Sequence, residues 1–146
     1  MRHFIKVGFA SLLAVITLNL STNVSAANSD ELYQQLGKQE GISRLVEELL
    51  FEIAGDNRIA DQFVDTDIDR LHRTLTEQIC EISGGPCSYS GDDMVKVHTG
   101  LEITQADMNA LVENLYTAME RLDIPVSAQN QLLALLAEMH DEVVGL

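Results

Sequence analysis

The chain has 146 residues, enough for one domain with a packed core, and it is strongly acidic. It carries 23 Asp and Glu residues against nine Lys and Arg residues, so its net charge at pH 7 is −14. Because such a charge repels phosphate backbones and anionic lipids, the composition excludes a nucleic-acid-binding protein. The acidic residues either form a simple solvated surface or attract a cationic partner.

The first 26 residues have the pattern of a secretory signal peptide. Arg2 and Lys6 precede an apolar run over residues 7–20, and Val24-Ser25-Ala26 offers the small residues of a cleavage site. An uncleaved anchor is the alternative, but the run is short for a membrane span. We therefore expect export to a bacterial periplasm, no membrane insertion after cleavage, and a mature domain over residues 27–146. Losing Arg2 and Lys6 would change the net charge to −16.

Apolar residues recur at helical spacing throughout the mature chain, and no segment shows sustained alternation, so the sequence predicts an all-α domain. Ser29 is the expected cap of a first helix. The stretch 37–41, with a glycine at each end, is expected to separate it from a second helix over 42–53. A short piece over 59–63 and an Asp-Thr-Asp cap cluster precede a third helix over 68–82.

The second half of the chain predicts a short helix and then two long ones. Thr104 and Asp107 have the spacing of a capping box, which opens the first long helix. Pro125 is expected to end that helix, and Ser127 to cap the last one. His140 falls in the last turns of the final helix, on its expected solvent side.

Cys80 and Cys87 are the only cysteines, and they stand on either side of a Gly-Gly-Pro turn. In an exported protein an even pair favours a disulfide, which would tie the turn to the preceding helix. Two buried free thiols are the alternative, because spacing alone does not fix the geometry. The sequence has no Cys-x-x-Cys-His motif, so it does not predict c-type haem attachment.

A Gly/Pro loop over 84–93 leads into the short helix, which carries His98 near its end and is stopped by Gly100. A neutral imidazole in such a place suits a metal ligand, since its second ring nitrogen can donate to a backbone carbonyl. Taken alone, His98 is more simply explained as a surface histidine. The surrounding residues decide between the two interpretations.

These residues resemble the group I truncated haemoglobins, short globins with a two-over-two helical sandwich around haem. The resemblance spans about residues 32–144 and is carried by Leu32-Tyr33-x-x-Leu36-Gly37, Phe63, Gly84-Gly85, Tyr89-x-Gly91-x-x-Met94-x-x-x-His98-x-Gly100-Leu101-x-Ile103-Thr104 and Leu122-x-Ile124-Pro125. It implies haem b as the cofactor, His98 as the proximal iron ligand and a diatomic gas as the partner.

The resemblance also implies which side chains contact the haem. Thr66, Arg70 and Tyr89 match positions that hold the propionates, with a merely solvated side chain as the alternative for Arg70. His72 is expected near the haem edge and not on the iron, because the family's second ligand position matches Thr74. The remaining expected contacts are Phe63, Leu71, Leu75, Ile79, Met94, Leu101 and Ile103.

The distal side departs from the family pattern. Leu50 matches the position of the family's oxygen-binding tyrosine, and Leu71 and Leu75 match positions that are often polar. The sequence thus predicts an apolar distal pocket, which loses a hydrogen bond to bound oxygen worth about 1–3 kcal/mol. Carbon monoxide and nitric oxide should lose less.

Three functions remain open from the sequence. The first is reversible binding of oxygen, nitric oxide or carbon monoxide at haem. The second is a redox enzyme at the same haem, either a nitric oxide dioxygenase, which needs an electron donor, or a peroxidase, which needs a distal acid–base group. The third is a haem-free helical interaction domain. The predicted pocket favours the first.

Overall fold

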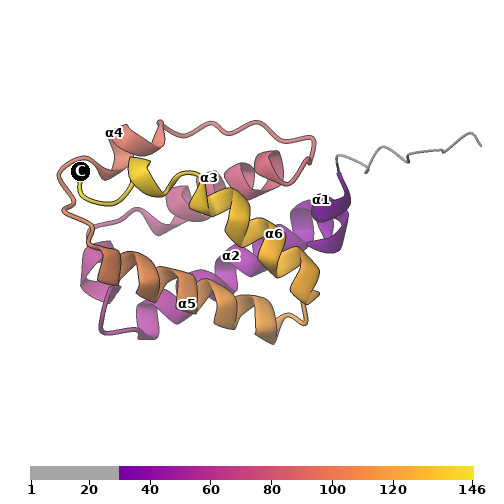
Figure 1. Cartoon of the computed structure of the whole chain (residues 1–146), viewed down its shortest axis with the longest axis horizontal. Helices are drawn as coiled ribbons and strands as arrows, with labels where there is room; N and C mark the ends of the chain where they lie inside the picture. Colours follow the sequence, from indigo (N-terminus) through magenta and orange to yellow (C-terminus); the bar gives the residue numbers. More distant parts are fainter. Residues whose placement is uncertain (1–29) are drawn as a thin grey trace, which may run out of the picture.

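A computed structural model describes residues 30–146, and it contains no strand among them (Figure 1). The helices are α1 (Glu31–Gln35), α2 (Lys38–Gly55), α3 (Ile68–Ile82), α4 (Met94–His98), α5 (Gln105–Arg121) and α6 (Val126–Ala137). The two 3-10 helices are η1 (Ala60–Phe63) and η2 (His140–Glu142). The all-α prediction is confirmed, whereas the predicted signal peptide and the Ser29 cap lie outside the described residues.

Two pairs of long helices form a sandwich. α2 packs against both α3 and α5, while α6 packs against α5 and α1. Figure 1 shows α5 and α6 in front of α2 and α3, with α4 near the C-terminal end of the chain. The arrangement buries the apolar stripe of each long helix, as amphipathic helices require.

The core is almost entirely aliphatic and is centred on α2. Side chains with less than 2% of their surface exposed come from four helices and include Ile42, Leu45, Val46, Ile79, Cys80, Met119 and Leu132. The apolar residues of α3 that face the other way, toward α4, are only half-buried. α3 therefore separates a closed core from a more open region around α4.

The break expected over residues 37–41 is confined to the two residues Leu36 and Gly37. Gly37 has a positive φ of 81° and ends the α1 segment, and α2 begins at Lys38. Gly41 lies inside α2, against the end of α1, where a Cβ would come within 2.2 Å of the Leu36 carbonyl oxygen. The glycine is therefore needed for close helix packing, which a breaker pattern does not distinguish from a turn.

The predicted boundaries around the last helix were wrong by a few residues. α5 ends at Arg121, before Pro125, and Asp123 then takes a positive φ of 52°. Pro125 is itself the N-cap of α6, and its carbonyl accepts from the N–H groups of Ala128 and Gln129 at 2.8 and 3.0 Å. Ser127 lies in the first turn and makes no side-chain cap.

Two predicted caps are present. The Asp67 side chain accepts from the Arg70 N–H at 3.0 Å and starts α3. Thr104 and Asp107 form a complete capping box at the start of α5, and the hydrogen bonds from Thr104 lower the pKa of Asp107. Within residues 30–146, no helix has the length and apolarity to cross a membrane.

Candidate haem site

α4 holds His98 in one defined orientation. The Asp93 side chain caps this helix by accepting from the Lys96 N–H at 2.9 Å, and Gly100 turns the chain away with a φ of 83°. His98 Nδ1 lies 2.8 Å from the carbonyl oxygen of Met94. Because a carbonyl can only accept, Nδ1 carries the proton, and Nε2 of the neutral ring keeps its lone pair.

Nothing else among the described residues bonds to the free nitrogen of His98. Apolar residues close to His98 in the chain are incompletely covered, since Val95, Val97 and Leu101 are exposed and Ile103 is only half-buried. Large apolar side chains around an unpaired ring nitrogen are what a flat apolar ligand with a metal centre would cover. These residues therefore fit a haem.

The three leucines predicted for the distal pocket come from two helices. Leu50 of α2 and the α3 residues Leu71 and Leu75 are half-buried, and none can donate a hydrogen bond. Leu50 and Phe63 together line a hollow of about 260 Å³. Ile79, also predicted to contact the haem, is 1% exposed and packs in the core instead.

Three polar side chains bond to Asp92: Arg70 and Tyr89, which were predicted to hold the propionates, and Lys96. Arg70 Nη2 lies 3.3 Å from Asp92 Oδ2, Lys96 Nζ bonds to Asp92 Oδ1, and the Tyr89 hydroxyl donates to the Asp92 carbonyl oxygen at 2.7 Å. The Lys96 bond is the main reason that the pKa of Asp92 is lowered. Burial, and then the Asp92 charge, raises the pKa of Tyr89.

This group can bind a second carboxylate. Two cations already hold the Asp92 carboxylate, and the Tyr89 phenol lies beside them on the Asp92 carbonyl oxygen, so a haem propionate would find the same donors by displacing or joining Asp92. Thr66, the other predicted propionate contact, is half-buried at the turn before α3. Lys96 was missed in the sequence, although its place two residues before His98 was a usable signal.

The other two histidines of residues 30–146 have partners of their own. His72 Nε2 is 3.1 Å from the Ser43 carbonyl oxygen of α2, so this nitrogen carries a proton and is not free to bind metal. Thr74 bonds to the Arg70 and Leu71 carbonyls of its own helix. His140 belongs to η2 and not to α6 as expected, because α6 ends at Ala137, and its Nε2 lies 2.8 Å from Gln105 Oε1.

Gln78 is a further site residue that the sequence analysis missed. Its amide donates to the sulfur of Met94 at 3.3 Å and to that of Met139 at 3.5 Å. It follows Leu71 and Leu75 on one stripe of α3, which was the available signal. Gln78 therefore links α3 to α4 beside the predicted haem contact Met94.

The loop before α4 is tied to α3 by a disulfide between Cys80 and Cys87, whose Cα atoms are 5.7 Å apart. Gly85 donates to the Cys80 carbonyl at 2.8 Å, and a Cβ at Gly85 would come within 2.6 Å of both Cys80 Sγ and the Tyr33 ring. The disulfide and this close packing fix the first part of the loop that carries Tyr89.

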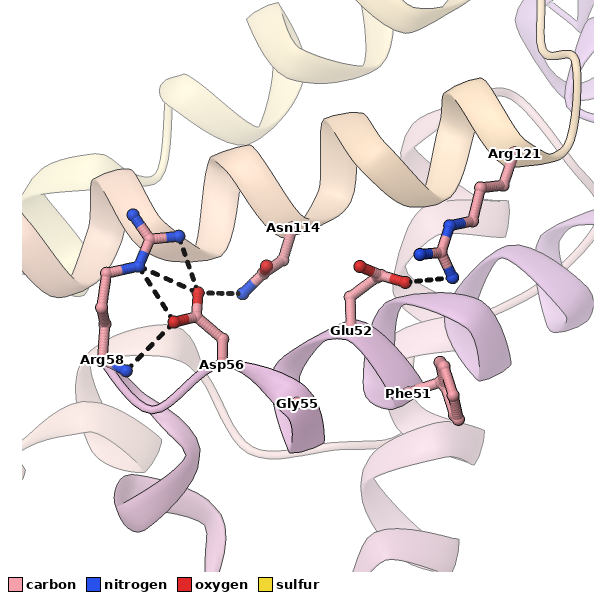
Figure 2. Close-up of a pocket in the computed structure, with 7 residues that line it drawn as sticks. All are labelled: Phe51, Glu52, Gly55, Asp56, Arg58, Asn114 and Arg121. Atoms are coloured by element: carbon pink, nitrogen blue, oxygen red, sulfur yellow. Dashed lines mark hydrogen bonds and ion pairs between the residues drawn. The ribbon is translucent and has the colours of Figure 1, made fainter.

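A second hollow, of about 380 Å³, opens on the side of α2 that faces α5 (Figure 2). Its charged residues are largely paired, since Asp56 binds Arg58 and Asn114, and Arg121 binds Glu52 at 2.5 Å. None of the predicted haem contacts lines it. It is therefore separate from the candidate site.

Comparison with known proteins agrees with this geometry. The model of the Bacterial-like globin family matches residues 31–144. A group 1 truncated hemoglobin of Nostoc commune is 35% identical over 105 residues, which cover 71% of this chain and 86% of that protein. A group 1 truncated hemoglobin of Tetrahymena pyriformis is 23% identical over 78% of this chain and 94% of that protein.

Solved structures show the same fold. The Fe(III) form of the truncated hemoglobin from Tetrahymena pyriformis matches with a TM-score of 0.76 and 23% identity, over 79% of this chain and 98% of that one. The 2/2 hemoglobin from Synechococcus, which carries covalently attached heme, matches with a TM-score of 0.74 and 21% identity over the same shares. This chain is a haem-binding globin and belongs to the Bacterial-like globin family, among its group 1 truncated haemoglobins.

Proposed function

We propose that this protein binds haem b through His98 Nε2 and reversibly binds a diatomic gas at the iron. One observation carries the proposal: the bond from His98 Nδ1 to the Met94 carbonyl fixes the tautomer in which Nε2 can ligate metal. When bound, haem would supply the iron that takes up the gas. The work of the chain is to hold, orient and shield it.

The residues of the proximal helix and those at the mouth of the site have different roles. His98 supplies the metal ligand, and the Met94 carbonyl keeps its ring in one rotation. Arg70, Lys96 and Tyr89 supply the positive charge and hydrogen bonds that propionates need at the mouth of the site. Leu101 and the other exposed apolar side chains around α4 would be covered by the porphyrin.

The distal leucines set the preference among gases. Leu50, Leu71 and Leu75 exclude water and donate no hydrogen bond, so bound oxygen loses about 1–3 kcal/mol relative to a pocket with a donor. Bound carbon monoxide and nitric oxide are less polar and lose less. The absence of a donor or acid–base group on these three side chains favours a binding protein over the alternative redox enzyme.

We also propose that the protein works outside the cytoplasm. The supporting observation in the described residues is the Cys80–Cys87 disulfide, which an oxidising compartment such as the periplasm would preserve. The predicted signal peptide over residues 1–26 supplies the export route. Fractionation of cells expressing the full chain, with detection of the shortened mature protein, tests both statements.

Absorption spectra of the ferric, ferrous and carbon-monoxide-bound protein test the haem site. We expect a Soret band that His98→Ala abolishes or shifts and that added imidazole restores, while His72→Ala and His140→Ala leave it unchanged. Extraction into acidic acetone separates haem b from covalently attached haem, the form in the Synechococcus structure. A colourless protein that does not take up hemin would refute the proposal.

A further inference from the structure

The apolar hollow of about 260 Å³ that Leu50 and Phe63 line on the distal side of the candidate haem site is open to the surface, and acidic side chains lie near its mouth. Its floor includes Leu50 and Phe63, the same side chains that face the predicted distal pocket, and its outer wall includes Val64 and Ile68. Val64 is 73% exposed and Ile68 46% exposed. We call the surface formed by this groove and Phe51, which also lines the second hollow between α2 and α5, the η1 face.

Phe51 extends the apolar area along α2. It is 69% exposed and precedes Ala54, which lines the groove, by three residues, so the two share a helix face. Phe51, Val64 and Ile68 thus expose large apolar side chains close to one apolar groove. The η1 face is therefore suited to an apolar contact with another molecule.

Carboxylates surround the η1 face and are not neutralised by the chain itself. Asp61, Asp65 and Asp69 are exposed and lie within three residues of Phe63, Val64 or Ile68, and exposed Glu47 is one turn before Phe51. No ion pair joins any of these four to another residue among positions 30–146. The rim is thus available for positive charge on a partner.

The negative charge around the η1 face favours a positively charged partner. A second copy of the mature chain would bring its own net charge of −16 to the contact, and an anionic membrane or nucleic acid would also be repelled. A basic protein surface with an apolar centre matches both parts of the η1 face. Since the groove floor is shared with the predicted haem pocket, a protein bound there would lie close to the porphyrin.

We propose that the η1 face docks a basic electron-carrier protein that exchanges one electron with the haem iron. The carrier loses the electron that converts ferric to ferrous iron, so no proton or other reactant is needed. The inference rests on the proposed haem site. It adds the place where reduction would occur and the charge of the protein that performs it.

The binding test uses a lysine-rich cytochrome c as the probe and an acidic flavodoxin as the control probe. Calorimetry and chemical-shift mapping at low salt should show that only the cytochrome binds, with shifts at Phe51, Val64 and Ile68 and a Kd that rises with salt. Asp65→Asn with Asp69→Asn should raise that Kd about three- to ten-fold.

Matched variants separate the η1 face from general acidity. Glu40→Gln with Glu81→Gln removes the same charge from exposed positions at the other ends of α2 and α3, and should change the Kd less than about two-fold. Val64→Lys should abolish binding, whereas Val126→Lys, at a valine of α6 that is 63% exposed, should not. Equal effects of the two acidic pairs, or of the two lysine variants, would refute the proposal.

Electron transfer gives a second readout, because an electron-transfer contact serves in both directions. In anaerobic stopped-flow experiments the ferrous protein should reduce ferric cytochrome c, and the same variants should slow this reaction in the same order. Failure to take up haem would count against the proposed function while leaving the binding assay intact. Two outcomes would count against the docking surface alone. One is haem-loaded protein that does not bind the cytochrome, and the other is a dimer that Val64→Lys converts to monomers.

Discussion

The amide of Gln78 on α3 donates to the sulfur of Met94 on α4, with 3.3 Å between the two atoms. Met94 is also the residue whose carbonyl accepts from His98. Gln78 therefore reaches the proximal helix one turn from the predicted iron ligand. No other side-chain hydrogen bond among residues 30–146 joins α3 directly to Met94 or His98.

Removing the Gln78 amide should loosen α4 and speed the loss of haem. Gln78→Ala is expected to raise the rate of haem dissociation about two- to ten-fold, since one hydrogen bond and its packing are lost. Gln78→Leu keeps the packing and should have the smaller effect. Transfer of haem to excess apomyoglobin measures the rate. Gln131→Ala, at an exposed position of α6, serves as the control, and an equal rate in all four proteins would contradict the role of Gln78.

Restoring a distal donor should slow oxygen dissociation. In Leu50→Tyr a phenol ring with its hydroxyl replaces the leucine side chain, and a hydrogen bond of about 1–3 kcal/mol corresponds to a decrease of roughly ten- to a hundred-fold in the off-rate. Leu50→Phe adds similar volume without the donor and should change the rate little. Flash photolysis and ligand replacement supply the rates. A carbon monoxide off-rate that fell as much as that of oxygen would show that the effect is steric.

Reduction of the disulfide should lower the free energy of unfolding by about 2–3 kcal/mol, because Cys80 and Cys87 close a short loop in the unfolded chain. Urea titrations with and without dithiothreitol measure this difference. The double variant Cys80→Ala and Cys87→Ala is the matched control, since dithiothreitol should not affect it. Identical unfolding midpoints for oxidised and reduced wild-type protein would mean that the bridge contributes no stability.

The protein should lose stability in acid, partly through Asp56. The Arg58 side chain and N–H, together with Asn114, lower the pKa of Asp56 well below its ordinary value of 3.8. A lowered pKa in the folded state stabilises the fold above pH 3.8, and this contribution disappears as the pH falls toward the folded-state value. Urea midpoints of the haem-free protein, measured from pH 7 to pH 3, should therefore fall more steeply for the wild type than for Asp56→Asn. Parallel curves would exclude the contribution.

The sequence alone predicted the features that depend on residues close together in the chain. The short helix ending at His98, the Asp67 cap and the Thr104–Asp107 capping box were all predicted, because each is decided within a few residues. The family resemblance added the two-over-two arrangement and the expected role of His98. The resemblance could be recognised because its glycines, Met94 and His98 keep their order and spacing.

The residues that sequence reasoning missed depend on contacts between helices. The role of Gln78 requires that α3 pass beside α4, and the partners of Lys96 include a carboxylate that also binds Arg70 of α3. The hydrogen bond of His72, which was expected near the haem edge, could not be foreseen because its acceptor, the Ser43 carbonyl, lies on another helix. Gly41 was misread for the same reason, since close approach of α1, and not a turn, requires a glycine there.

The acceptor of the His98 ring proton also has an electronic consequence. A peptide carbonyl is a weak base, so the imidazole keeps its proton and acquires little imidazolate character, unlike a ring paired with a carboxylate. Such a ligand pushes little electron density toward a bound metal, which favours the ferrous state and disfavours O–O bond cleavage. With haem bound as proposed, one backbone oxygen at Met94 would thus bias the iron toward holding gases and away from oxidising other molecules.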